Sequence, residues 1–402
     1  MGAIREIITP SPAELAKEFD SLNVDQGGVG IMSPKSFFHV LRLRRLKSPA
    51  ANILKQEMLS VGGECAASRT VILGDDQPQD AIIMGTRRQL AKVVIKLKAQ
   101  PFGLRRVAEQ IDAFLKLPRQ PLQDVAAPID SLAGDPAAYP LIMGILNITT
   151  DSFSDGGSYF DAVDAVEHGL ALFEEGAEIV DVGGESTRPG SEPVAADEEL
   201  SRVVPVIAKL RERTDWPISI DTMKAPVARE ALRAGATLVN DVSAGRHDPE
   251  MFATVAEAGC PYVMMHMQGE PKSMQHNPHY EHLMDELHRF FDERLNQAVQ
   301  AGVAEEQMIL DPGIGFGKRR EDSYEILRRL GELRSFGRPL LVGVSRKSFL
   351  QNELGETPQE RLEESIAAGT IAMVNGAAML RVHDVRPALK SRAVVRSLAA
   401  RL

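Results

Sequence analysis

The strongest constraint in this sequence is an eightfold alternation of short apolar runs with longer helix-like stretches across residues 139–402. Nearly every apolar run ends in a charged or hydrogen-bonding residue, as Leu141–Leu146 ends in Asn147 and Ile218–Ile220 ends in Asp221. Eight strand–helix units in roughly 260 residues have the length and order of a (β/α)8 barrel. In that fold the carboxyl ends of all strands open at one mouth, where catalytic residues lie. The pattern therefore predicts an α/β fold, a TIM barrel, together with the residues that line its mouth.

The six remaining runs end in the same way. They are Glu178–Gly184 before Glu185, Thr237–Val239 before Asn240 and Asp241, Tyr262–Met265 before His266, Met308–Leu310 before Asp311, Leu340–Val344 before Ser345, and Ala377–Leu380 before Arg381 and His383.

Composition narrows the class of protein. The chain has 402 residues, of which 44% are hydrophobic and 25% charged, and no apolar run is long enough to span a bilayer, so we expect no membrane helix. The first residues lack the layout of a signal peptide, and Cys65 and Cys260 fall in different predicted domains, which favours a reduced cytoplasmic setting without a disulfide. The net charge of −10 argues against nucleic-acid binding but allows an anionic small substrate in a locally basic pocket.

The part of the chain before the barrel indicates a second domain. Composition predicts a small α+β domain over residues 1–118, a linker over 119–139 that is rich in Pro, Ala and Asp, and the barrel over 140–402. In the small domain we expect a strand at Ala81–Gly85 and helices at Arg87–Lys98 and Gly103–Leu115. We also expect a helix at Phe37–Leu46, introduced by Ser33-Pro34.

A basic cluster lies at the end of that last expected helix. It consists of Arg42, Arg44, Arg45 and Lys47 and is interpreted as a solvated helix face, although contact with an anion or a partner is an alternative. Nothing in residues 1–118 indicates a function.

Two long loops follow the first two predicted strands. Residues 147–157 are polar, rich in Gly and Ser, and too long for a minimal turn, so they are expected to cover or bind a ligand. The alternative is a surface loop that caps the next helix through Asp161. In residues 183–190, glycines allow close backbone approach and Arg188 can hold an anion through two hydrogen bonds.

Carboxylates and an amide end three further strands. Asp221, Asn240 and Asp311 suit a heterocycle rich in N–H donors, but the set could also hold a metal or cap helices. The glycines after Asp311 do not form a nucleotide-binding P-loop, because that motif needs Gly at Pro312 and Ser or Thr at Arg319.

Cationic and donor side chains follow the last two strands, where barrels frequently bind phosphate. They are Arg346, Lys347, Arg381 and His383. His266, after the fifth strand, could lie near the mouth or be a satisfied core histidine.

Taken together, these segments resemble the dihydropteroate synthase family. The matching segments are MGILNITTDSFSDGG (143–157), DVGGESTRPG (181–190), ISIDT (218–222), LVNDVSAG (238–245), MHMQG (265–269), LDPGIGFGK (310–318), VGVSRKSF (342–349) and RVHDV (381–385). They run in the family's order, and the resemblance does not reach residues 1–118. Thr150 stands where the family usually has Pro, a difference expected to loosen the loop without removing a chemical group.

The resemblance implies a fold, a reaction and a cofactor. The family's fold is the (β/α)8 barrel, and its reaction joins 6-hydroxymethyl-7,8-dihydropterin pyrophosphate to 4-aminobenzoate, giving 7,8-dihydropteroate and pyrophosphate with Mg²⁺. The implied partners are therefore these small molecules, and members of the family usually form homodimers. The resemblance leaves open kinetic constants, sulfonamide sensitivity and the role of the extra domain.

The resemblance also implies roles for single residues. The residues expected to hold the pterin are Asp221, Asn240, Asp311 and Lys347. Those expected to hold the pyrophosphate are Asn147, Arg381 and His383, with Asn147 as the metal ligand. Those expected to contact the aminobenzoate are Phe153, Thr187, Arg188, Pro189 and Ser348. The implied catalytic residues are Asp221, Asp311, Lys347 and Arg188.

Two other readings stay open from the sequence. A pterin-dependent methyltransferase acting on a corrinoid would share the barrel and the pterin-holding residues but would not need the cations after the last two strands. A non-catalytic pterin-binding paralogue would have little use for the two long loops.

Overall fold

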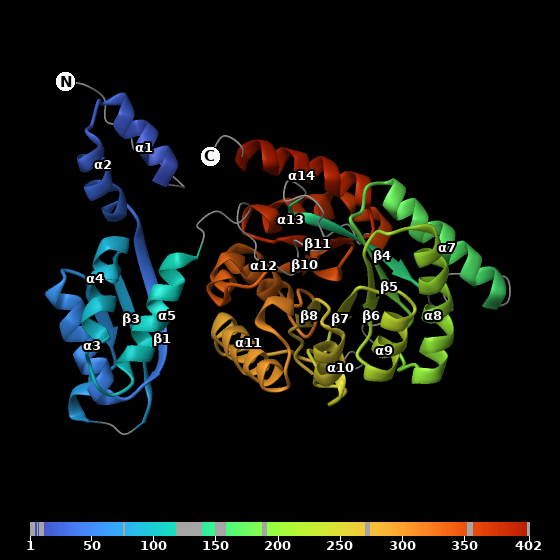
Figure 1. Ribbon diagram of the computed structural model, residues 1–402, viewed down its shortest axis with the longest axis horizontal. Coiled ribbons are helices and arrows are strands. Elements are labelled where there is room, and N and C mark those ends of the chain that lie inside the picture. The colour runs from blue at the N-terminus through green and yellow to red at the C-terminus, as the bar shows by residue number, and fades with distance from the viewer. Residues whose placement is uncertain are drawn as a thin grey trace. The chain divides into compact units, whose positions relative to one another are not determined.

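The computed structural model describes residues 12–74, 77–117, 139–148, 158–186, 191–269, 274–351 and 357–399, together with Arg5 and Ile7. The chain forms two compact units, residues 1–120 and residues 121–401, which are described separately below (Figure 1).

The second unit contains a barrel of eight parallel strands. The strands are β4 (Leu141–Asn147), β5 (Ile179–Gly183), β6 (Ile218–Asp221), β7 (Leu238–Asp241), β8 (Tyr262–Met265), β9 (Met308–Asp311), β10 (Leu341–Gly343) and β11 (Met379–Val382). They pair in the order β10-β11-β4-β5-β6-β7-β8-β9, and a parallel bridge between Leu310 and Leu340 joins the two ends. The predicted TIM barrel is therefore confirmed.

Helices alternate with these strands and surround them in the ribbon view (Figure 1). The α-helices are α7 (Ser158–Glu174), α8 (Ala196–Arg213), α9 (Ala225–Arg233), α10 (Met251–Ala258), α11 (Leu283–Gln300), α12 (Arg320–Arg329), α13 (Leu362–Val374) and α14 (Val385–Ala399). Short 3-10 helices are η5 (Glu305–Gln307), η6 (Leu330–Phe336), η7 (Ser348–Leu350) and η8 (Pro358–Glu360).

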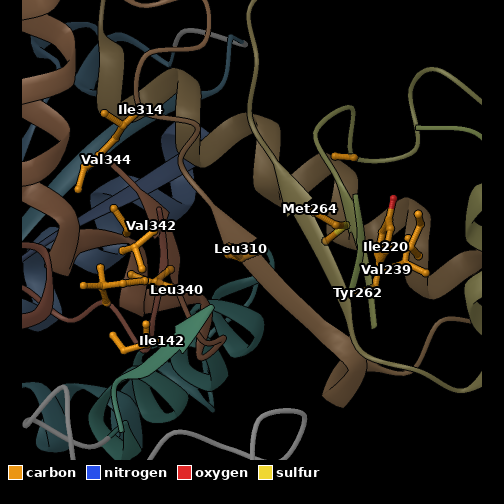
Figure 2. Packing of buried hydrophobic residues seen from close by; sticks show 14 of the residues in the cluster. Ile142, Ile220, Val239, Tyr262, Met264, Leu310, Ile314, Leu340, Val342 and Val344 are labelled. Atoms are coloured by element: carbon orange, nitrogen blue, oxygen red, sulfur yellow. The ribbon is translucent and has the colours of Figure 1, made fainter. Parts of the chain in front are cut away.

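Successive strand residues point to opposite sides of the barrel wall, which separates two apolar layers. The outer layer lies between strands and helices and includes Ile142, Ile220 and Leu310 (Figure 2). A separate cluster of the opposite parity fills the barrel interior, with Leu141, Met143, Ile179, Leu238, Val263, Ile309, Leu341 and Met379 among its members. The interior is thus a packed core, and polar side chains can face inward only beyond it.

The first unit has a three-stranded antiparallel sheet packed against helices. The strands are β1 (Phe38–Leu46), β2 (Glu64–Ala67) and β3 (Gln79–Thr86), paired in the order β1-β3-β2. The helices are α1 (Pro12–Ser21), α2 (Gln26–Met32), α3 (Ser48–Ser60), α4 (Arg87–Leu97) and α5 (Leu104–Lys116), with 3-10 helices η1 (Ser33–Lys35) and η2 (Arg69–Leu73). Leu54, Ile83, Leu90 and Ile111 are among its buried core residues. The predicted small α+β domain and its expected strand and two helices are confirmed.

The helix expected at Phe37–Leu46 is wrong, because these residues form β1. The strand pairs with β3 from Phe38 opposite Thr86 to Leu46 opposite Gln79. Leu and Arg favour helices locally, but pairing along β3 overrides that preference. The basic cluster therefore lies on and just after a strand, and Arg42 pairs with Asp80 at 3.0 Å.

Three further predictions can be placed. Cys65 and Cys260, which we expected not to form a disulfide, are both buried free thiols. Across the described residues, no helix has the length and apolarity needed to cross a bilayer. The linker predicted at 119–139 lies outside the described residues except for Tyr139.

Candidate active site

The predicted site residues occupy inward-facing positions just beyond the apolar cluster that fills the barrel interior. Because side chains alternate along a strand, the residue two positions after an interior apolar residue also faces the interior. Asn240 follows Leu238 in this way, and Asp311 follows Ile309. By the same parity Asn147, Asp221 and Arg381 face inward at the ends of β4, β6 and β11. The strand register pairs Asp221 with Asn240, so these ends lie at one level of the barrel.

Three of these side chains form one connected cluster with Asp181 of β5. Arg381 donates to Oδ2 of Asp181 at 2.5 Å and to Oδ2 of Asp221 at 2.8 Å. Asn240 donates to Oδ2 of Asp181 at 3.0 Å. Asp181 is fully buried, and its Oδ1 has no hydrogen-bond partner among the described residues. One guanidinium thus ties together strands β5, β6 and β11.

The environment of Asp221 favours its neutral form. Burial raises the pKa of this carboxyl to about 7, against the attraction of Arg381 and with added repulsion from Asp181. A ligand that donates hydrogen bonds to the carboxylate would stabilise the charged form.

A second group lies between the loops after β9 and β10. Oδ1 of Asp311 accepts from the backbone N–H of Gly313 at 2.7 Å. The Lys347 ammonium donates to the carbonyl of Ile314 at 2.5 Å and lies 4.6 Å from the centre of the Phe316 ring. Burial lowers the pKa of Lys347 to about 8, although the nearby Asp311 acts to raise it. Burial also raises the pKa of Asp311, and Lys347 opposes that shift.

The glycines after Asp311 serve packing. A Cβ on Gly313 would lie 1.9 Å from the carbonyl oxygen of His266, and one on Gly317 would lie 2.3 Å from that of Gln268. Both residues also have positive φ, at 64° and 59°. These glycines let the β9 loop lie directly on the β8 loop, which agrees with rejecting a nucleotide-binding loop here.

The cations after β10 and β11 have different surroundings. Nδ1 of His383 lies 3.1 Å from the hydroxyl of Ser345. The guanidinium of Arg346 is held by both oxygens of Asp384, at 3.0 and 2.6 Å. The charge of Arg346 is therefore matched by a neighbouring carboxylate, and this residue does not join the cluster around Arg381.

Ser348 opens the single 3-10 turn η7 and is exposed. It lines an open, polar hollow of about 500 Å³ together with Gly315, Lys318, Arg319 and residues of the β8 loop.

His266 is a core residue. It is buried, its Nδ1 lies 3.0 Å from the ammonium of Lys318, and its ring packs edge-on against Phe290. Burial holds the pKa of His266 well below its usual value and lowers the pKa of Lys318 to about 7. Of the two readings that the sequence left open, the structure favours the satisfied core histidine.

Four predicted residues lie outside the described residues, namely Phe153, Thr187, Arg188 and Pro189. The ends of the second loop are described. Glu185 accepts a hydrogen bond from the backbone N–H of Val194 at 3.1 Å, which closes the base of this loop.

Asn147 is the predicted metal ligand. It is partly buried at the end of β4 opposite Gly183. A Cβ on Gly183 would lie 3.6 Å from Oδ1 of Asn147, so glycine leaves room beside this oxygen. In the described ranges no group of three or more His, Cys, Asp or Glu side chains could hold a metal. The amide oxygen of Asn147 is of the ligand type that Mg²⁺ takes, because this ion prefers oxygen ligands and usually completes its shell with phosphate oxygens and water.

Sequence reasoning missed two residues of the site. Asp181 could have been predicted, because it is a carboxylate in the middle of the apolar strand Ile179–Gly183 and a buried carboxylate usually has a partner. Phe316 gave no such signal, since its place against Lys347 depends on how two loops meet.

Comparisons with known proteins agree with this geometry. The family described as pterin binding enzyme matches residues 143–383. Dihydropteroate synthase of Escherichia coli strain K12 is 46% identical over 258 residues, covering 64% of this chain and 91% of that protein. A solved structure of Xanthomonas albilineans dihydropteroate synthase with 4-aminobenzoic acid has a TM-score of 0.61 at 44% identity, covering 65% of this chain and 93% of that chain.

Some relatives match more of the sequence. The probable bifunctional folylpolyglutamate synthase/dihydropteroate synthase of Haloferax volcanii is 38% identical over 351 residues, which is 85% of this chain but 41% of that protein. The barrel unit alone is shorter than this, so the match extends into the N-terminal unit.

Proposed function

The chain belongs to the dihydropteroate synthases of the pterin binding enzyme family, and from this premise we propose how its side chains divide the reaction. The reaction forms a bond between the arylamine nitrogen of 4-aminobenzoate and the methylene carbon of the pterin substrate. The bond from that carbon to pyrophosphate breaks, pyrophosphate leaves with the electron pair, and the arylamine nitrogen releases one proton.

The proposal rests on one observation, a hydrogen-bonded polar cluster that lies next to the apolar interior of the barrel. Its members are Asp181, Asp221, Asn240 and Arg381. We assign the pterin to Asp221, Asn240, Asp311 and Lys347. Carboxylate and amide oxygens match the N–H edge of the ring, and the two carboxylates stabilise positive charge that develops at the methylene carbon. Burial strengthens that interaction because the local dielectric constant is low.

The opposite end of the substrate needs positive charge. We assign the pyrophosphate to Asn147, Arg381 and His383, with Asn147 offering its amide oxygen to Mg²⁺. When bound, Mg²⁺ would neutralise charge on the leaving pyrophosphate. Arg381 can supply positive charge to the pyrophosphate, because it lies beside Asp221, to which we assign the pterin.

The arylamine attacks as a neutral nucleophile and needs no strong base. We assign 4-aminobenzoate to the side of Lys347 and Phe316, with its carboxylate toward Ser348 and the hollow described above. Phe153, Thr187, Arg188 and Pro189 would close over it and exclude water, which would otherwise capture the activated carbon.

Two features of the whole protein are also proposed. A homodimer through α13 and α14 is supported by exposed apolar side chains on these neighbouring helices, Ile371, Val374, Val394 and Leu398. Sedimentation velocity at micromolar concentration should then give twice the chain mass, and a monomer would reject the dimer. A cytoplasmic location is supported by two free cysteines, and fractionation of cells would check it.

The assignment is tested by measuring dihydropteroate formation with the pterin pyrophosphate, 4-aminobenzoate and Mg²⁺. The wild type should turn over, and Lys347→Ala should lose at least about 100-fold in kcat/KM, as expected for a buried cation that contacts substrate. Arg346→Gln is the matched control, because Asp384 already neutralises this cation, and its activity should stay within about threefold of wild type. A wild type that binds the pterin pyrophosphate without turnover would overturn the catalytic role.

A further inference from the structure

Asp181 is a buried carboxylate that contacts both halves of the candidate site. It lies in the middle of β5, two positions after Ile179, so its side chain faces the barrel interior. Its Oδ2 accepts from Nδ2 of Asn240 at 3.0 Å and from Nε of Arg381 at 2.5 Å. Asn240 is assigned above to the pterin, and Arg381 to the pyrophosphate. One carboxylate oxygen therefore joins the residues proposed for two different parts of the substrate.

The contact with Asp181 fixes which way the Asn240 amide points. A side-chain amide carries a donor nitrogen and an acceptor oxygen on opposite sides of one planar group. Because Oδ2 of Asp181 accepts, the nitrogen of Asn240 faces Asp181 and the amide oxygen points away from it. No side chain other than Asp181 hydrogen-bonds to this amide in the part of the chain that the structure describes. The amide oxygen is therefore left for a ligand that donates, such as an N–H group of a pterin.

The same carboxylate fixes the direction of the Arg381 guanidinium. Nε of Arg381 donates to Asp181, and Nη2 donates to Asp221 at 2.8 Å. A guanidinium holds its five N–H donors in a rigid fork, so two contacts along one edge set the direction of the remaining donors. The Arg381 side chain is 21% exposed, and its Nη1 has no hydrogen-bond partner among the described residues. These remaining donors can hold an anion through two hydrogen bonds.

A second buried ion pair on the same strand shows what a structural carboxylate looks like. Glu178 immediately precedes β5, at the end away from the mouth, and its Oε1 pairs with Arg392 at 2.7 Å. Its Oε2 accepts from the backbone N–H of Ile142 at 2.8 Å, so both oxygens are used within the fold. Asp181 is fully buried, yet its Oδ1 has no partner among the described residues. An unsatisfied buried oxygen is costly and is expected where the orientation of neighbours matters more than stability.

We propose that Asp181 is a positioning residue, which orients the Asn240 amide and the Arg381 guanidinium so that the site accepts hydrogen bonds from the pterin and donates them to the pyrophosphate. The inference rests on the proposed function, in which these two residues hold the two parts of the substrate. Orientation requires an acceptor oxygen at residue 181 and does not require its charge. A neutral acceptor should therefore replace the carboxylate, whereas an apolar side chain should not.

The first test is calorimetry of pterin pyrophosphate binding with Mg²⁺ and without 4-aminobenzoate. Asp181→Leu keeps the branched shape but removes the acceptor, and should weaken binding at least about tenfold. Asp181→Asn keeps an oxygen and should stay within about threefold of wild type. Glu178→Gln is the matched control, because it changes a buried, ion-paired carboxylate next to the same strand, and it should alter the dissociation constant by less than about twofold.

Kinetics give a second readout in the same variants. Lys347 and Phe316, to which the arylamine is assigned, share no hydrogen bond with Asp181. The KM for 4-aminobenzoate in Asp181→Leu should therefore stay within about threefold of wild type while the affinity for the pterin pyrophosphate falls. A general loss of structure would weaken both substrates together and would contradict the positioning role.

A reciprocal pair of substitutions tests the amide orientation directly. Asn240→Asp keeps the oxygen that faces the ligand but turns a second oxygen toward Asp181, so pterin pyrophosphate affinity should fall at least about tenfold. Adding Asp181→Asn restores one donor and one acceptor to this contact and should recover at least about tenfold relative to Asn240→Asp alone. Losses that simply multiply would show that the two residues act independently and would reject the proposal.

The remaining outcomes also decide the question. An unchanged dissociation constant in folded Asp181→Leu would overturn the proposal, and so would an equal loss in Asp181→Asn, because charge rather than orientation would then matter. If Asp181→Leu does not fold, the reciprocal pair decides alone. A wild type that does not bind the pterin pyrophosphate would reject the proposed function itself, so the two failures are distinguishable.

Discussion

The barrel unit and the N-terminal unit differ in the kinds of side chain that they bury. In the barrel, Asp181, Asp221, Asn240 and Asp311 are almost completely buried near the strand ends. Among the described residues of the N-terminal unit, Ser48 is the one buried polar side chain. Both units have continuous apolar cores.

This difference shows where the chain accepts an energetic cost. Burying a charged group is unfavourable unless it is paired, and even a paired group can be less stable than an apolar replacement. In the described part of the N-terminal unit, ion pairs keep at least one partner exposed to solvent, such as Lys96 in its pair with Glu57 at 2.9 Å. The barrel places Arg381 between two buried carboxylates, as expected of an interior that recognises a ligand.

The largest effect should come from neutralising both pterin carboxylates. Asp221→Asn combined with Asp311→Asn should lower kcat/KM by at least about 1,000-fold, because the amides cannot stabilise positive charge on the pterin. Turnover of dihydropteroate measures the loss. Glu230→Gln combined with Glu332→Gln removes two exposed carboxylates and should have almost no effect. Full activity in the first pair would remove the carboxylates from the mechanism.

A smaller effect is expected from pH. The pKa of Asp221 is raised to about 7 and that of Lys347 is lowered to about 8. Below the first value Asp221 is protonated and binds pterin N–H groups poorly, and above the second Lys347 loses its charge. The profile of kcat/KM should therefore rise by about tenfold per pH unit toward pH 7 and fall above pH 8. Asp221→Asn should abolish the acidic limb of whatever activity remains.

Lys318 provides the control for this profile, because its pKa is lowered to about 7 as well. If Lys318→Met removes the acidic limb and Asp221→Asn does not, the assignment to Asp221 is wrong. The pH dependence of folding stability gives an independent test of the raised pKa of Asp221. A carboxyl whose folded pKa is raised from 3.8 to about 7 costs no stability below the lower value and destabilises the fold as pH rises through this range.

The smallest effect on catalysis should come from removing the N-terminal unit. The predicted boundaries, with a domain over 1–118 and a linker over 119–139, motivate a truncation to residues 136–402. Its kcat/KM should stay within about twofold of the full chain, because the cluster around Arg381 lies entirely in the barrel. Circular dichroism would verify folding, and a folded but inactive truncation would show that the N-terminal unit takes part in catalysis.

Strand parity explains how much of the site could be predicted. In a buried parallel strand the polar residue at the carboxyl end stands out against an apolar run, as Asp311 does after Met308–Leu310. The barrel brings all such ends to one mouth, so a linear pattern was enough to name Asn147, Asp221, Asn240 and Arg381. The helix wrongly expected at Phe37–Leu46 had no comparable signal, because its sheet partner lies about 40 residues further along the chain.

The sequence by itself determined the barrel, the family and the set of polar strand ends, because alternation and local motifs are short-range properties. The tertiary structure alone decided the pairings. Arg381 pairs with Asp181, 200 residues away in the sequence. Arg346 pairs instead with Asp384, and His266 contacts Lys318. These choices depend on distances set by barrel closure and on the need of each buried charge for a partner, which no local pattern specifies.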